Sequence, residues 1–307
     1  MRNKTSVVVV LILVVFGYDV MAQNTFSPYT IKGIGDLSNM SLSSHFAMGE
    51  VGIGTPSVWH INNLNPALLP YNTLTSFQLG VGAESRTVSS QTQSQKSGSG
   101  GIRYMAFAFP IMPSKWTSSF GFLPYSSVNY NVTSQDVVQG TAIPVTFNFK
   151  GQGGITQVYF SNGFNLSKGF TIGVKTSFLF GFVENETITY LGDANFSAPL
   201  ASALFEKTNY RGFKLEGALA YRKKIEDKKF VNVGFIYEAA SDLNGTRLLR
   251  LERRSTSGTF PGDTLVNNEK GNFSLPSEIG LGFSYEKLNT YTLSFDVKQQ
   301  KWDQFAG

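Results

Sequence analysis

Hydrophobic and polar residues alternate with a period of two along most of the chain after residue 72. In the clearest segment Val174, Phe178 and Phe180 share one face. Lys175 and Ser177 share the other face. Such alternation predicts β-strands with one apolar face and one polar or small face. The pattern predicts nine strands, over residues 73–86, 101–110, 115–128, 153–165, 169–184, 210–223, 228–240, 277–286 and 290–301.

The lengths of the strands and of their connectors favour a membrane barrel. A soluble β-sandwich also alternates, but its strands average about five or six residues. The segments here reach ten or more, the length that a tilted strand needs to cross a bilayer. Short and long connectors alternate along the chain, as they do in outer-membrane barrels. The long ones are predicted over residues 87–100, 129–153, 184–210 and 241–275.

The sequence therefore predicts an all-β fold, a transmembrane antiparallel β-barrel over residues 73–307. Nine is an odd number, whereas bacterial single-chain barrels close with an even number of strands. A ninth strand would leave an unpaired edge, which is costly in lipid. We therefore expect the barrel to be incomplete at the C-terminal end of this sequence.

The first 22 residues resemble a secretory signal peptide. Arg2 and Lys4 give a positive start, residues 7–16 are all apolar, and a cleavage site fits after Ala22. This order is typical of export signals. A membrane anchor would need about 20 apolar residues, twice the length of this run. The mature chain is expected to begin at Gln23, and its location is expected to be the cell outer membrane.

Composition narrows the function classes. The chain has no cysteine, so disulfides and thiolate chemistry are excluded. Its charge of +5 is spread out and forms no basic block, so a nucleic-acid partner is not expected. The two histidines, His45 and His60, precede the first strand, and no motif joins them to a catalytic serine or a metal site. We expect no enzymatic activity, no catalytic residue, no metal and no cofactor.

Residues 23–72 lack the strand pattern and are rich in Gly, Ser, Asn and Pro. A segment of this kind before a first barrel strand can hang as a flexible tail or fold into the lumen as a hatch. Aromatic residues and the Asn-Pro turn favour the hatch. Proline ends the irregular segment and an asparagine side chain can bond local backbone. We expect Asn65, Pro66 and Ala67 to anchor the hatch at the base of the first strand.

Five short motifs carry a resemblance to a known family. They are Ser27-Pro28-Tyr29, Gly33-Ile34-Gly35-Asp36-Leu37, Ala47-Met48-Gly49, Leu64-Asn65-Pro66-Ala67 and Pro124-Tyr125-Ser126-Ser127-Val128-Asn129-Tyr130. Together they resemble the FadL/TodX family of outer-membrane transporters, in particular its Bacteroidetes branch. The resemblance implies a barrel of about fourteen strands, an N-terminal hatch, and transport of small hydrophobic compounds such as long-chain fatty acids. It also implies release sideways through a kinked third strand.

Pro124 lies inside the third predicted strand. Proline cannot donate a ladder hydrogen bond, so it predicts a bulge, a kink or an end of pairing. If residue 124 lies above the membrane, water takes the place of the missing bond. If it lies within the membrane, Phe122, Leu123 and Tyr125 would flank a gap through which an apolar ligand leaves into lipid.

Eight charged residues fall on the predicted lumen face. They form either a structural network that holds the hatch or, in part, a site for a substrate carboxylate. The eight are Glu84, Lys175, Lys214, Glu216, Arg222, Glu238, Asp296 and Lys298.

Four arginines follow the seventh predicted strand, at or beyond the outer membrane surface. Guanidinium groups pair well with phosphates, so lipopolysaccharide is a candidate partner. An ordinary solvated loop would explain the cluster equally well. The four are Arg247, Arg250, Arg253 and Arg254.

The sequence thus favours a transporter whose partners are outer-membrane lipid, lipopolysaccharide and hydrophobic small molecules. Two alternatives remain open. One is an accessory or shuttle barrel of a type IX secretion system, of the PorV type, with secretion-system partners. The other is a purely structural outer-membrane protein.

Overall fold

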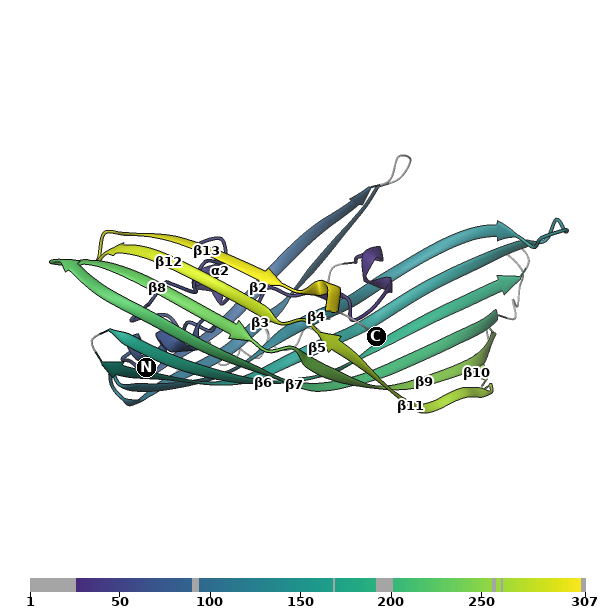
Figure 1. Cartoon of the computed structure of the whole chain (residues 1–307). Coiled ribbons are helices and arrows are strands. Elements are labelled where there is room, and N and C mark those ends of the chain that lie inside the picture. The colour runs from purple at the N-terminus through teal and green to yellow at the C-terminus, as the bar shows by residue number, and fades with distance from the viewer. Residues whose placement is uncertain are drawn as a thin grey trace, which may run out of the picture.

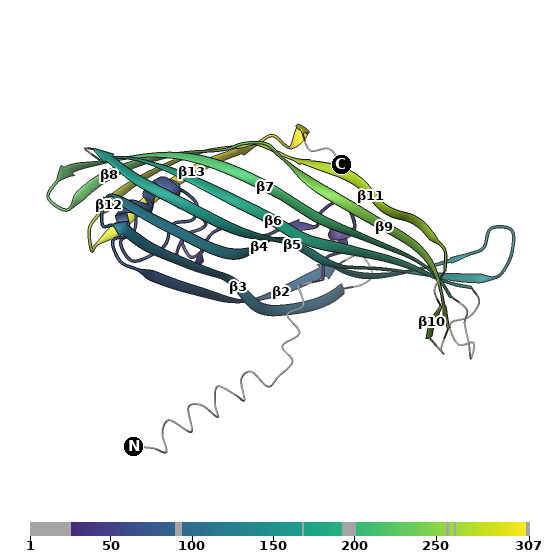
Figure 2. The ribbon, with the colours of Figure 1, turned by 90° about the horizontal axis from the view of Figure 1, so that it is seen from below.

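The computed structural model describes residues 26–89, 94–167, 169–191, 201–255, 258–260 and 262–304. The predicted signal peptide lies outside these residues. The chain is all-β, and one antiparallel sheet curls into a half-barrel (Figures 1 and 2). In the described ranges no helix is long and apolar enough to span a membrane.

The N-terminal part contains only short elements. They are the 3₁₀-helix η1 (Pro28–Ile31), the strand β1 (Asp36–Leu37), the helix α2 (Ser43–Phe46) and the 3₁₀-helix η2 (Pro66–Tyr71). The sheet follows with β2 (Ser76–Ser89), β3 (Ser94–Met112), β4 (Trp116–Val137), β5 (Pro144–Ser167), β6 (Phe170–Leu191), β7 (Ala201–Glu226), β8 (Lys229–Glu238), β9 (Ser241–Ser255), β10 (Gly258–Phe260), β11 (Thr264–Leu275), β12 (Glu278–Lys287) and β13 (Tyr291–Gln300), and the 3₁₀-helix η3 (Trp302–Gln304) comes after it.

The wall of the half-barrel follows the order β13-β12-β8-β7-β6-β5-β4-β3-β2, which is nine strands. These nine agree with the nine strands expected from the alternation. Among the described strands, β2 and β13 pair on one side only, so closure of the sheet into a full barrel stays a prediction.

The long connectors expected over residues 87–100, 129–153, 184–210 and 241–275 are wrong in large part, because strands run through them. β2 and β3 pair up to Ser89↔Ser94. β4 and β5 pair up to Val137↔Pro144, and β6 and β7 pair up to Tyr190↔Ala201. β8 continues as β9 after a two-residue break, and β11 continues as β12, so β7 pairs with β8 along one half and with β9 along the other. A strand as long as β4 or β6 reaches roughly 75 Å, which is well beyond a hydrocarbon core of about 30 Å.

One face of the sheet is apolar and exposed. Side chains in register across five strands form a row on this convex face. Exposure of such a row is costly in water and favourable in lipid. On β7 the next outward side chain above the row is Arg211, whereas on β6 the outward Phe180 and Phe182 continue the apolar face. The row is Met105, Phe122, Val158, Phe178 and Phe213.

The opposite, concave face holds the N-terminal segment, residues 26–75 (Figure 2). Leu42, Ile61 and Leu69 pack with Tyr104 and Tyr159 of the wall. A second cluster joins Ile53, Ala67 and Leu68 to Ala218, Ala220 and Ile236. The core of the molecule is therefore the contact between this segment and the inner face of the sheet.

The segment approaches the strands at glycines. A Cβ added to Gly234 would collide with the backbone carbonyl of Ile53. A Cβ added to Gly217, on the outward side of β7, would meet open space. The inner glycines therefore let two backbones touch where any side chain would hold them apart.

We predict that Gly234→Ala loosens the N-terminal segment, because overpacking against backbone typically costs about 1–3 kcal/mol. The measurement is the rate of protease cleavage within residues 40–75 of the detergent-solubilised protein. Gly217→Ala adds the same methyl group in open space and should leave the rate unchanged. Equal rates in both variants would mean that the close approach at Gly234 does not hold the segment.

Candidate functional site

The wall opens between β3 and β4. These two strands pair only from Met105↔Phe122 to Met112↔Trp116. Beyond this point β4 continues to pair with β5 as far as Val137, while residues 94–104 of β3 pair with β2 alone among the described strands. Strands β2 and β3 accordingly diverge from β4 in Figure 2. The result is a gap with a free strand edge on each side.

Pro124 stands two residues beyond the last pair of β3 and β4. The β4–β5 register shifts between Pro124 and Ser126. A residue without an amide proton suits this position because it has no ladder bond to lose. Phe122 is exposed on the outer face, whereas Leu123 and Tyr125 are buried on the inner side. The four residues thus lie at the gap, and their use as a ligand route stays a prediction.

The N-terminal segment covers part of the free edge of β4. Strand β1 pairs antiparallel with it through Asp36↔Ser127 and Leu37↔Ser126. The amide of Ser38 donates to the carbonyl oxygen of Tyr125 at 2.8 Å. Farther along, residues 131–137 of β4 have no strand partner on this side among the described residues. The segment is a short substitute for β3 over a few residues of a longer edge.

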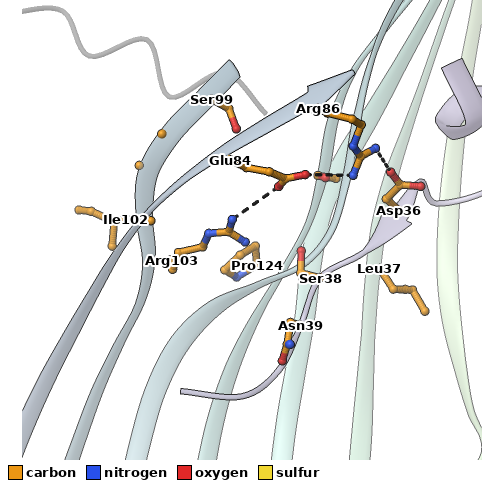
Figure 3. A pocket seen from close by; sticks show the side chains of 14 residues that line it. Asp36, Leu37, Ser38, Asn39, Glu84, Arg86, Ser99, Ile102, Arg103 and Pro124 are labelled. Atoms are coloured by element: carbon orange, nitrogen blue, oxygen red, sulfur yellow. Dashed lines mark hydrogen bonds and ion pairs between the residues drawn. The ribbon is translucent and has the colours of Figure 1, made fainter. Parts of the chain in front are cut away.

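Charged side chains line a cavity of about 250 Å³ within the gap (Figure 3). The guanidinium of Arg86 on β2 contacts the carboxylate of Asp36 on β1 at 2.7 Å and that of Glu84 at 3.2 Å. Arg103 on β3 reaches Glu84 at 3.5 Å. At least a third of each of these side chains is exposed, so solvent screens the ion pairs. Each pair therefore contributes only about 1 kcal/mol or less to stability. Their geometric effect is to tie β1 to the β2–β3 side of the gap.

An apolar cavity of about 150 Å³ adjoins the charged one. Phe46, Tyr104, Leu123 and Pro124 line it, and Pro124 borders both cavities. The hydroxyl of Tyr104 donates to the Ser43 hydroxyl at 2.8 Å and accepts from the Ser43 amide at 3.0 Å. The tyrosine is thereby fixed to α2, and the cavity can hold a small apolar group beside the gap.

Asn65, Pro66 and Ala67 lie buried together at the start of η2. The side-chain oxygen of Asn65 accepts from the amide of Ala67 at 2.9 Å, and its Nδ2 donates to the carbonyl oxygen of Ile53 at 2.7 Å. Asn65 thus caps η2 and joins it to the preceding turn. The anchoring role expected of these residues stays a prediction, but their contacts are of the kind it requires.

Two further residues hold the same segment. Asn62 was not among the residues singled out from the sequence, whereas Asp296 was among the charged residues that a hatch-holding network could include. Asn62 accepts from the amides of Leu64 and Asn65 and donates to the carbonyl of Gly52. Asp296 on β13 accepts from the amides of Gly52 and Ile53 at 2.7 and 2.8 Å. The run of asparagines in residues 62–65 was the sequence signal that could have pointed to Asn62. The partner of Asp296 could not be predicted, because it depends on the fold.

The charged residues expected on the lumen face divide into four places. Glu84 lies in the gap, and Asp296 holds the N-terminal segment. Arg222 pairs with Glu286 at 2.9 Å near the short turns, with its guanidinium over the ring of Phe230. The others line one cavity on the concave side, and they are Lys175, Lys214, Glu216, Glu238 and Lys298.

The four arginines lie on strand β9, so the loop expected there is wrong. Arg247 pairs with Glu206 at 2.6 Å, and Arg254 pairs with Glu186 and Glu252. Arg250 and Arg253 are exposed. Two of the four guanidinium groups are therefore engaged with carboxylates of the sheet, and contact of any of them with lipopolysaccharide stays a prediction.

His45 in α2 is almost completely buried. Its ring lies against Gly52 and Leu64 of the same segment. Burial disfavours the imidazolium form, and the nearby charge of His60 adds to the effect, so the pKa of His45 falls to about 4. In the part of the chain that the structure covers, no group of three or more His, Asp or Glu is placed to hold a metal ion.

A family model named BamG matches residues 1–307, the whole of the sequence. BamG is a family of outer-membrane β-barrel proteins related to the Bam complex. The assignment to the FadL/TodX family is therefore wrong, since the short motifs that suggested it do not define the family of this chain. No curated protein and no solved structure matches the chain. The match and the barrel-like fold fit a location at the outer membrane or in association with the periplasm.

We predict that acidification releases the N-terminal segment. The pKa of His45 is about 4 in the folded protein, below its ordinary value of 6.5. Between these two pH values the released segment binds a proton that the docked segment does not, so docking is strongest above pH 6.5 and weakens as the pH falls towards 4. The full effect is about 3 kcal/mol.

Protease cleavage within residues 40–75, measured from pH 7.5 to pH 4.5, checks this prediction. His45→Gln should flatten the profile, while His60→Gln should keep most of it because burial is the larger cause. A profile that is the same with and without His45 would contradict it.

We also predict that Arg86→Ala loosens β1. The chain has no cysteine, so a single Ser126→Cys reports on the covered edge of β4. Losing the contact with Asp36 should raise the rate of maleimide labelling about fivefold, as expected for a loss of about 1 kcal/mol. Arg211→Ala, on the outer face of β7, serves as the control. Unchanged labelling in Arg86→Ala would mean that the ion pair does not hold β1.

Proposed function

The chain belongs to the BamG family, and on that premise we propose that it is an outer-membrane barrel protein that assists the assembly of other outer-membrane proteins. The relation of the family to the Bam complex supports this role. The proposal includes a membrane position in which the exposed apolar row faces lipid and the N-terminal segment acts as a hatch on the inner side.

The observation that carries the proposal is the free edge of β4. A strand edge presents unpaired amides and carbonyls, and an extended chain from another protein can pair with them. Strand β1 already uses this edge in that way over two residue pairs. The remaining edge, residues 131–137, is long enough to receive a further strand, which a partner in barrel assembly can supply.

The contents of the concave side also favour a binding role over an open pore. The N-terminal segment packs against β4, β5, β6, β7 and β8 through buried side chains. Asp296 ties it to β13 as well. A channel for polar solutes would need this space to be free.

Site-specific photo-crosslinking tests the edge. A benzoylphenylalanine at Thr133, on the free edge, should give crosslinks to another outer-membrane protein in cells. The same residue at Asn209, which is exposed but paired on both sides, should not. Depletion of the chain should lower the amount of other folded outer-membrane barrels, measured by heat-modifiable gel mobility. Absence of crosslinks from Thr133, together with unchanged barrel amounts, would contradict the proposal.

A second candidate function is the uptake of small hydrophobic compounds with sideways exit at Pro124. The apolar cavity beside the gap favours it. Pro124→Val restores an amide proton and should narrow the opening, so that uptake of labelled oleate slows several-fold while folding is kept. Pro110→Val on β3, away from the free edges, is the matched control. Equal uptake by the parent and Pro124→Val would exclude this route.

Lipopolysaccharide and secretion-system partners are also proposals, and fewer observations support them. Exposed Arg250 and Arg253 are the available groups for lipopolysaccharide phosphates. Among the described residues, no contact specifically favours a role in type IX secretion. We propose no enzymatic activity.

A further inference from the structure

Positive charge gathers at one end of the wall, which we call the short-turn end. The turns between β3 and β4, β5 and β6, β7 and β8, and β12 and β13 lie there. The tips of β7–β8 and β12–β13 mark this end on the left of Figure 1. Among the described residues of these turns and of the strand ends beside them, cations outnumber carboxylates. The cations are Lys115, Arg222, Lys223, Lys224, Lys228, Lys229 and Lys287, and the carboxylates are Glu226, Asp227 and Glu286.

Each carboxylate of the short-turn end pairs with one of these cations. Four lysines therefore have no ion-pair partner among the described residues, and they are Lys115, Lys223, Lys228 and Lys287. All of them except Lys287 are exposed, and Lys287 is half-buried. The engaged pairs are Glu286 with Arg222 at 2.9 Å, Asp227 with Lys224 at 3.1 Å and Glu226 with Lys229 at 2.6 Å.

Aromatic rings stand beside two of the unpaired lysines on the outer face. On β7, Lys223 follows Tyr221 by two residues, so both side chains point outward about 7 Å apart. On β12, Lys287 follows Tyr285 in the same way. Such rings are favoured where lipid chains meet head groups. Each tyrosine also meets a ring of the neighbouring strand, with centroids 5.7 Å apart for Phe170 and Tyr221 and 6.1 Å apart for Tyr285 and Tyr291.

The length of β7 places Lys223 at the level of the lipid head groups. Between Arg211 and Lys223 no outward position of β7 carries a charge. This stretch extends about 40 Å along the strand, and with the tilt of about 35–45° found in barrels it covers about 30 Å across a membrane. That distance is the thickness of the hydrocarbon core. The uncharged outward positions are Phe213, Leu215, Gly217, Leu219 and Tyr221.

We propose that the short-turn end binds anionic phospholipid, with head-group phosphates held by Lys115, Lys223 and Lys287 and acyl chains lying against the outer face. The proposal rests on the membrane position given under the proposed function and not on the assembly role. Short turns face the periplasm in bacterial barrels, where the membrane leaflet consists of phospholipid. Charge complementarity favours anionic head groups, since a zwitterionic head group carries an ammonium that the lysines repel.

Electron spin resonance of spin-labelled lipids tests the proposal with the full chain in phosphatidylcholine vesicles. Labelled phosphatidylcholine should show a motionally restricted component, which checks the membrane position by itself. Labelled phosphatidylglycerol should associate about two- to fivefold more strongly at about 0.1 M salt, because one lysine near an anionic surface contributes up to about fivefold. This preference should approach one at about 1 M salt, where the Debye length falls to about 3 Å.

A pair of double variants locates the effect. Lys223→Gln with Lys287→Gln should remove about half of the preference for phosphatidylglycerol or more. The matched control is Lys150→Gln with Lys270→Gln, on β5 and β11 away from the short turns. These two lysines are exposed and form no ion pair among the described residues, so the control removes the same charge. It should keep the preference of the parent.

The proposal is overturned if phosphatidylglycerol and phosphatidylcholine associate equally with the parent protein. It is also overturned if the control pair lowers the preference as much as the pair at the short-turn end. A restricted component without lipid preference contradicts this proposal alone. Absence of a restricted component for every lipid would contradict the membrane position and this proposal together.

Discussion

Every amide and carbonyl of a wall that faces lipid must find its hydrogen-bond partner inside the protein. From β4 to β7 the wall meets this requirement with continuous ladders. Between β3 and β4 the ladder stops beyond Met105↔Phe122. At the next level the outward residues are Thr156 on β5 and Arg211 on β7, but Phe180 on β6. The opening therefore begins where polar residues first enter the apolar face, and β1 supplies only part of the missing pairing.

The strands could be predicted from the sequence where an apolar outer face and a packed segment on the inner face impose strict alternation. Farther along the strands both faces of the sheet carry polar residues. Residues such as Asn131, Thr133 and Gln135 therefore carry no period-two signal, and they were assigned to loops although they form β4. The rules for strand length describe the membrane crossing and do not limit how far a strand continues outside it.

The candidate site was predictable where a residue's own chemistry limits its place. Pro124 marks the end of pairing because it lacks an amide proton, and Asn65 caps a turn because its side chain reaches nearby backbone. Parity along the strands also placed Lys175 and Glu216 on the inner face. Their partners could not be predicted, since which carboxylate meets which lysine depends on the register between strands. The partners of Asp296 and Glu278 could not be predicted for the same reason.

The contact between Asp296 and the amide of Gly52 joins residues 244 positions apart in the chain. The N-terminal segment precedes the sheet in the chain, yet the carboxylate that receives it belongs to β13, the last of the described strands. Closing so long a loop is slow, and contacts of such high sequence separation form late in folding. The segment must therefore stay undocked until β13 is in place, so that its docking follows the pairing of the described strands and does not start it.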